Sequence, residues 1–394
     1  MDGATMRAGI YVHIPFCVRK CAYCDFSSYP GLQSLFAPYV DAVRAEAEAA
    51  QEHWAAVGFD TAYLGGGTPT ALPAALLAEV LDACYGRLAL QPGSEVTVEA
   101  NPGTVDADGL RALRTAGASR LSLGFQSLDD DELAVLGRMH SAAGAVEALA
   151  LAREAGFDNV SVDLMFGLPG QRLADWRTTL ARTLDLRPEH LSLYALTVEE
   201  ETPLASGIAC GALPAPDEDL AADMYEAAME MLAEAGYAHY EISNWARRVP
   251  DEDASPLALP RLASRHNVKY WRNGPYLGLG AAAYSYDGEA RYGNVRHPRE
   301  YIRRIAAGES PIAERETPDE ALRMGETMML GLRLTAGVSH ADFEARFGRS
   351  LEEAYGPVIE EFREAGLLER DAAGIRLTVR GRLLGNRVFG AFLP

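Results

Sequence analysis

The chain has 394 residues, of which 48% are hydrophobic, and its formal net charge at pH 7 is −20. This length and apolar content predict two or three domains with sizeable cores. The acidic balance argues against a nucleic-acid partner, because phosphate binding needs concentrated Lys and Arg, and no apolar run reaches the roughly 18 residues that a membrane span requires.

The first predicted strand, residues 9–14, leads directly into a loop with three cysteines. Cys17, Cys21 and Cys24 follow a C-x3-C-x2-C spacing. Three thiolates this close in sequence can converge on one iron–sulfur cluster and leave one iron of a cubane open to a small molecule. The main alternative is structural zinc, which needs a fourth ligand, and the nearest candidate is His13.

Strand and helix patterns then alternate six times. The strands are predicted at residues 9–14, 60–64, 95–100, 120–125, 160–165 and 190–196. The helices are predicted at residues 34–54, 73–88, 106–116, 129–137, 142–155, 173–186 and 217–235. Such alternation predicts a parallel sheet covered by helices. A full eightfold barrel takes about 250 residues, so the sequence predicts an α/β fold with an incomplete (β/α)6 TIM-type barrel.

Polar residues recur at or just beyond the ends of these strands. They are the cysteines, the Gly-Gly-Gly-Thr-Pro run at 65–69, Glu99, Gln126 and Asp163. Parallel barrels assemble their active sites at the carboxyl ends of the strands, so these residues predict one shared pocket. The glycine run is not a Walker loop, because no Gly-Lys-Ser/Thr ends it, but glycines after a strand let backbone approach a ligand.

The last part of the chain differs in character. A Pro- and Asp-rich loop is predicted at 251–262, and three helices at 320–334, 340–347 and 351–365 precede a hairpin at 367–370 and 375–378. This order predicts a winged-helix-like α+β domain, and its acidic excess favours a docked accessory domain over DNA binding. The predicted domains are residues 1–245, 246–315 and 316–394.

The cysteine spacing resembles that of the radical S-adenosylmethionine (SAM) superfamily, and the flanking residues resemble its coproporphyrinogen III oxidase-like family. Further matches are Glu99 in Glu-Ala-Asn-Pro, Gln126 in Gly-Phe-Gln-Ser, Arg138 in Leu-Gly-Arg-Met-His, and Asp163 in Asp-Leu-Met-Phe-Gly-Leu-Pro. The resemblance implies a [4Fe-4S] cluster on the three cysteines, with SAM on its open iron. The SAM contacts implied by it are Tyr11, Tyr23, Gly66, Gly67, Thr68, Glu99, Gln126, Arg138 and Asp163. Whether one or two SAM molecules bind stays open.

The stretch from His266 to Trp271 matches an HNxxYW signature of the heme-chaperone branch of this family. A neutral imidazole is a suitable axial ligand of heme iron, and Tyr270 and Trp271 could pack against a porphyrin face. The resemblance implies a chaperone that binds the cluster, SAM and heme and passes heme to acceptor proteins. Few cysteines lie outside the cluster motif and the N-terminus has no signal pattern, so we expect a cytoplasmic protein that meets membranes only through an acceptor.

Two enzymatic alternatives remain. An oxygen-independent coproporphyrinogen III oxidase would cleave SAM to decarboxylate its substrate, but that enzyme carries a further cysteine where this chain has Phe26, and a long N-terminal extension. A class C radical SAM methyltransferase shares the barrel and the cysteines, and the HNxxYW match argues against it. Cleavage of SAM by this chain, the acceptor and the oligomeric state stay open.

Overall fold

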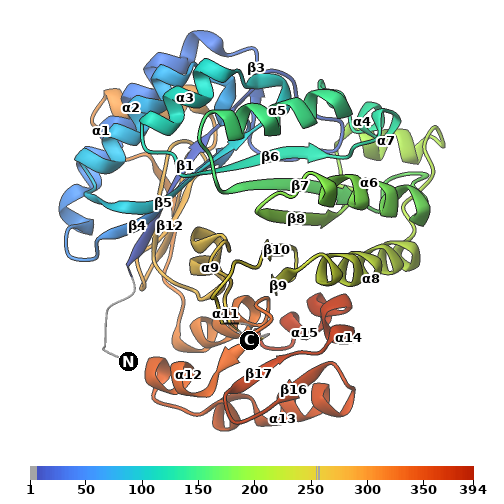
Figure 1. Cartoon of the computed structure of the whole chain (residues 1–394). Coiled ribbons are helices and arrows are strands. Elements are labelled where there is room, and N and C mark those ends of the chain that lie inside the picture. Colours follow the sequence, from blue (N-terminus) through green and yellow to red (C-terminus); the bar gives the residue numbers. More distant parts are fainter. Residues whose placement is uncertain (1–6, 254, 256–257) are drawn as a thin grey trace.

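A twelve-stranded open sheet dominates the computed structural model, which describes residues 7–253, 255 and 258–394. The first six residues and part of the predicted loop at 251–262 lie outside this range. The strand order is β14-β13-β12-β11-β1-β4-β5-β6-β7-β8-β10-β9. Figure 1 shows helices along the outer side of the sheet and the C-terminal segment as a separate lobe beyond its end.

Six parallel strands at the centre of the sheet follow one another in chain order. They are β1 (Ala8–Ile14), β4 (Phe59–Gly66), β5 (Leu90–Ala100), β6 (Arg120–Gln126), β7 (Val160–Phe166) and β8 (His190–Ala195). The connecting helices are α1 (Phe36–Trp54), α2 (Ala74–Gly86), α3 (Ala107–Thr115), α4 (Asp130–Val135), α5 (Ala142–Glu154) and α6 (Leu173–Asp185). The predicted incomplete (β/α)6 barrel is confirmed, and it is open rather than closed.

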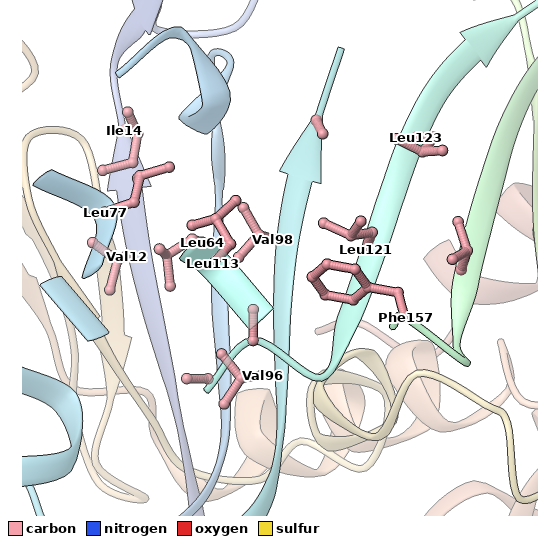
Figure 2. Close-up of a cluster of buried hydrophobic side chains, with 14 of the residues drawn as sticks. Val12, Ile14, Leu64, Leu77, Val96, Val98, Leu113, Leu121, Leu123 and Phe157 are labelled. Atoms are coloured by element: carbon pink, nitrogen blue, oxygen red, sulfur yellow. The ribbon is translucent and has the colours of Figure 1, made fainter. Parts of the chain in front are cut away.

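Successive side chains on each central strand point to opposite faces, as the two-residue period requires. Val98, Leu121 and Leu123 are buried on the outer face among helix residues such as Leu77 and Leu113 (Figure 2). Each such apolar side chain contributes about 1.5–3 kcal/mol when fully buried. The alternate positions carry polar side chains toward the lumen, so the sheet that supplies the core also supplies the walls of a polar cavity.

Both edges of the sheet extend beyond the barrel. Strand β11 (Tyr276–Leu279) pairs in parallel with β1 and continues antiparallel through β12 (Tyr284–Tyr286), β13 (Arg291–Asn294) and β14 (Ile312–Glu316). On the other side, β10 (Asn244–Arg247) and β9 (Tyr237–Glu241) pair antiparallel beyond β8. Helices α7 (Pro203–Ala209), α8 (Glu218–Glu234), α9 (Arg265–Trp271) and α10 (Pro298–Ala306) accompany these strands.

The C-terminal lobe has its own core, which includes Met328, Phe343 and Ile375. It contains α11 (Glu320–Gly331), α12 (His340–Phe347), α13 (Leu351–Glu364) and a small sheet of β15 (Val338–Ser339), β17 (Gly374–Leu377) and β16 (Leu368–Arg370). Helices α14 (Val379–Leu383) and α15 (Gly385–Gly390) follow. The predicted winged-helix-like arrangement is confirmed. Across the described residues, no helix is both long and apolar enough to cross a bilayer.

Candidate functional site

A cavity of about 320 Å³ opens at the carboxyl ends of the central strands. All three motif cysteines line it, together with residues from β4 to β8. Of the predicted SAM contacts, Tyr23, Gly66, Gly67, Thr68, Glu99, Gln126, Arg138 and Asp163 line the same cavity. The prediction that these residues share one pocket is therefore met by the geometry, whereas Tyr11 lies outside the lining.

The cysteine loop lies over the mouth of this cavity. Cys17, Cys21 and Cys24 are half-buried free thiols. Arg138 Nη1 donates to Cys21 Sγ at 3.3 Å, and Thr68 Oγ1 lies 3.5 Å from Cys17 Sγ. Burial raises the pKa of Cys24. Three half-buried sulfurs on one short loop, near a cationic side chain, form a donor set that suits an iron–sulfur cluster.

The zinc alternative depended on His13 as fourth ligand. Both nitrogens of the His13 ring are already hydrogen-bonded, one to Tyr11 Oη and the other to the Ser27 carbonyl, each at 3.0 Å. The structure therefore gives no support to a four-ligand zinc site here.

The glycine run packs directly against the cysteine loop. Gly66 has a φ of 109°, a backbone conformation that favours glycine. A Cβ at Gly67 would lie 2.6 Å from the Phe16 carbonyl oxygen, and Gly67 N donates to the Ile14 carbonyl at 2.9 Å. Only glycine allows this close approach of two backbones, which forms a narrow cradle beside the cysteines.

Two buried carboxylates lie deeper in the cavity. Glu99 accepts hydrogen bonds from Tyr63 Oη at 2.8 Å and from Gly66 N at 3.2 Å, and burial raises its pKa to about 7. Asp163 accepts from Ser122 Oγ at 3.0 Å, and burial raises its pKa as well. Both carboxylates keep oxygen lone pairs for ribose hydroxyls or an ammonium group.

Gln126 ends β6, the strand between those that carry Glu99 and Asp163, and Arg138 lies in the loop between α4 and α5. Gln126 has a φ of 66° at a register shift of β6 against β7, and its side chain lines the cavity. Arg138 Nη2 donates to the Gly124 carbonyl at 2.6 Å, and its buried Nε has no hydrogen-bond partner among the described residues. A guanidinium held in this way can still receive a carboxylate.

The residues present therefore fit both cofactors that the sequence suggested. Cys17, Cys21 and Cys24 would hold the cluster, and the glycine cradle with Glu99, Asp163 and Arg138 would hold SAM. When bound, this pair supplies one-electron chemistry at the carbon–sulfur bonds of SAM. The protein side chains bind and orient the cofactors and, through partial burial, limit the access of solvent.

The HNxxYW motif lies at the other end of the lumen. It forms α9, whose first backbone N–H groups, those of Arg265 and His266, donate to the Glu95 carboxylate at 3.0 and 2.9 Å. Lys269 fixes the helix further through an ion pair of 2.6 Å with Asp60. Asn267, the second residue of the motif, lines the cavity. The helix therefore closes the lumen from below.

The imidazole of His266 is only 1% exposed. Its Nδ1 lies 3.0 Å from Thr61 Oγ1, and its Nε2 lies 3.0 Å from Tyr270 Oη. Burial lowers its pKa to about 3, so the ring is neutral at physiological pH. Trp271 stacks under Arg333, with the guanidinium carbon 4.4 Å from the ring centroid. None of the three predicted heme-contact side chains lines the cavity.

Several cavity residues escaped sequence reasoning, among them Arg120, Ser192, Tyr194 and Asn267. The strand residues among them could have been identified from the two-residue alternation of side chains along a β-strand. Counting back in steps of two from Asp163 or Gln126 marks which positions of each strand face the lumen.

Comparison with known proteins gives consistent similarities. The model of the radical SAM superfamily matches residues 11–182, and that of the HemN C-terminal domain matches residues 318–384. The chain is 38% identical to a Bacillus subtilis protein named heme chaperone HemW, over 97% of this chain and 98% of that protein. It is 39% identical to a Synechocystis protein of the same name, over 85% and 80% of the two chains.

A mouse protein named radical S-adenosyl methionine domain-containing protein 1, mitochondrial, is 34% identical over 100% of this chain and 89% of its own. Among solved structures, coproporphyrinogen III oxidase (HemN) from Escherichia coli superimposes with a TM-score of 0.84 over 98% of this chain and 90% of that chain. Its sequence identity is 24%, so this likeness bears on the fold alone.

Proposed function

Because this chain belongs to the radical SAM superfamily and, within it, to the family of HemW heme chaperones, we propose that it binds heme and delivers it to acceptor proteins. The observation that carries the proposal is the similarity of almost the whole chain, at 36–38% identity, to several proteins named heme chaperone HemW. The HNxxYW motif supports it, because it places an imidazole and two aromatic rings on one short helix.

Membership in the superfamily implies a [4Fe-4S] cluster and SAM. We propose Cys17, Cys21 and Cys24 as cluster ligands, and the cavity residues described above, with Tyr11 behind them, as the surroundings of SAM. All five cysteines are free thiols, which supports the proposed reducing cytoplasm.

The oxidase alternative is favoured by no observation at the site. The position at which that enzyme carries its further cysteine holds Phe26, which is 62% exposed at the edge of the cavity. A phenyl ring offers neither a metal ligand nor a titratable group. The methyltransferase alternative likewise lacks a supporting feature.

We propose that heme contacts the HNxxYW helix, with His266 as iron ligand and Tyr270 and Trp271 beside the porphyrin. Coordination needs one free ring nitrogen, so His266 must give up its contact with Thr61 or with Tyr270. Because His266 is also buried against Thr61 of β4, with only 1% of the residue exposed, heme binding through His266 requires α9 to move away from β4. This requirement makes the proposal testable by structure as well as by affinity.

The experiment is an anaerobic heme titration of the cluster-reconstituted protein, followed by absorbance. His266→Gln should weaken a saturating Soret change at least tenfold, whereas His53→Gln, which alters an exposed histidine on α1, should not. Hydrogen exchange of residues 265–271 should rise when heme binds the wild type. Equal titration by both variants would place heme elsewhere, and no saturable binding by the wild type would refute the chaperone function.

A further inference from the structure

Arg120 is a fully buried cation whose role neither the cluster nor the HNxxYW helix explains. It is the first residue of β6, and its side chain is 2% exposed. It nevertheless lines the cavity, so the guanidinium is shielded from bulk solvent and turned toward the lumen. Burying an unpaired charge is among the most costly arrangements in a protein, and side chains that remain so placed need a partner.

No such partner is found among the described residues. The buried Nε of Arg120 has no hydrogen-bond acceptor, and none of the ion pairs found in the described residues involves Arg120. Arg138, which also lines the cavity, donates from one terminal nitrogen to Cys21 and from the other to the Gly124 carbonyl. Both terminal nitrogens of Arg138 are thus engaged, whereas no described residue accepts a hydrogen bond from Arg120.

The nearby acids do not take up the guanidinium. Glu99 accepts hydrogen bonds from Tyr63 Oη and Gly66 N, and Asp163 accepts one from Ser122 Oγ. Their negative charges act on Arg120 from a distance, and its positive charge in turn lowers the pKa values of both acids. This longer-range balance reduces the cost of burying the charge but leaves the planar N–H fork facing the cavity.

The register of the sheet sets the depth of this group. Thr97 pairs with Arg120 and Glu99 pairs with Ser122, so Arg120 starts two residues further from the cysteine end than the level of Glu99. Asn267 of the HNxxYW helix lines the same cavity from below. A ligand group that reaches Arg120 must therefore extend past the two acids into the lower lumen.

We propose that Arg120 binds a carboxylate of the ligand held in the lumen. The guanidinium presents parallel N–H donors that match the two oxygens of a carboxylate, and a charge-assisted bond in a buried site is stronger than a neutral one. Heme carries two propionates, so the carboxylate we assign to Arg120 is a heme propionate, and this inference rests on the proposed function.

The test measures dissociation constants on the anaerobic, cluster-reconstituted full chain. The variants are Arg120→Gln, which removes the charge, and Arg120→Lys, which keeps the charge without the planar fork. Arg87→Gln is the matched control, because it removes one positive charge from an exposed position far from the cavity. The ligands are iron protoporphyrin IX and the dimethyl ester of that porphyrin.

The wild type should lose about 10- to 100-fold in affinity for heme when the propionates are esterified. Arg120→Gln should bind heme that much more weakly than the wild type and no longer distinguish it from the ester. Arg120→Lys should recover part of the loss, and Arg87→Gln should match the wild type.

The proposal is overturned if Arg120→Gln binds heme as tightly as the wild type does, or if the wild type binds the dimethyl ester as tightly as heme. The second comparison needs no variant, so it decides the matter even where Arg120→Gln fails to fold. Either result leaves the chaperone function standing, because wild-type heme binding is measured in the same series.

Discussion

The five cysteines have different surroundings, although all are free thiols. Cys17, Cys21 and Cys24 line the cavity, Cys84 is buried in α2, and Cys210 is exposed. We expect Cys21→Ser to lose the cluster, because a hydroxyl is a poor ligand for iron and Arg138 would lose its sulfur acceptor. Iron and sulfide analysis with electron paramagnetic resonance of the reduced protein measures this. Cys210→Ser should keep full cluster content, and equal loss in both variants would contradict the assignment.

Glu99 predicts a pH dependence of SAM binding. Its pKa is raised to about 7 by burial, so the carboxylate that would accept hydrogen bonds from SAM is only partly ionised near neutrality. SAM affinity of the wild type should therefore rise up to about tenfold between pH 6 and pH 8, because the deprotonated fraction rises by that factor.

The control for this prediction is Glu99→Gln, which has the same shape and no titration. Its SAM affinity should be lower than that of the wild type at pH 8 and should stay flat over the same range. Equilibrium dialysis with labelled SAM measures both profiles. A wild-type profile as flat as that of the variant would mean that the charge of Glu99 does not act on SAM.

At the scale of elements, the cradle depends on a close backbone approach rather than on any side chain. A methyl group at Gly67 would overlap the Phe16 carbonyl, which belongs to the loop that carries the cysteines. Gly67→Ala should lower the free energy of unfolding by roughly 1–3 kcal/mol and abolish SAM binding, because the loop must shift. Chemical denaturation and SAM dialysis measure the two effects.

Gly86→Ala provides the matched control for that substitution. Gly86 ends α2, and a Cβ there would meet no atom within 4 Å. This change should raise the free energy of unfolding by about 0.5–1 kcal/mol, since alanine favours the helix, and it should leave SAM binding unchanged. If the two variants behave alike, the steric account of the cradle is wrong.

The strength of the alternating pattern decided which elements were predictable from sequence. The six parallel strands are runs of Val, Leu and Ile between clear turn signals, so their pairing and order followed. The strands from β9 to β14 were missed because they are short, and β11 to β13 are rich in Gly and Tyr. Their strand character comes from pairing with an existing sheet edge, which is a tertiary effect.

The candidate site divides in the same way. Residues in contiguous motifs, such as the cysteines and Gly66, were found from local spacing. Arg120 was not found, because a lone arginine at the start of a strand has no local signature and gains meaning only when the lumen is assembled. The engagement of His266 with Thr61 was equally invisible, since 205 residues separate the two partners.

At the scale of the whole molecule, one junction connects the barrel edge, the HNxxYW helix and the C-terminal lobe. Ile242 N, just after β9, donates to the Arg333 carbonyl at 3.1 Å, and the Arg333 guanidinium stacks on Trp271. Glu241 forms an isolated bridge with Leu334. A movement of α9 that exposes His266 must therefore disturb contacts with the lobe, so heme binding and the position of the lobe should be coupled.

Glu241 lies at this junction, and its burial predicts how the stability of the protein depends on pH. The side chain is fully buried, and burial raises its pKa from 4.5 to about 7, although the charge of Arg333 and the polar groups of Ser243 and Asn244 act to lower it. The folded protein thus holds this proton more tightly than the unfolded chain does. Between pH 4.5 and 7 the contribution of Glu241 to the free energy of unfolding therefore falls as pH rises.

Glu241→Gln removes that penalty, so its effect must appear at high pH and vanish at low pH. We expect the variant to exceed the wild type in free energy of unfolding by up to about 3 kcal/mol at pH 8, a limit set by 1.36 kcal/mol per pKa unit, with no gain near pH 4.5. Urea denaturation across this range measures the free energy of unfolding of both proteins. Both contain the same buried histidines, so the titration of these histidines cancels in the difference between variant and wild type. A pH-independent difference would mean that the carboxylate is ionised at no cost and is held at the junction by a charge partner, for which Arg333 is the candidate because its charge lowers the pKa of Glu241.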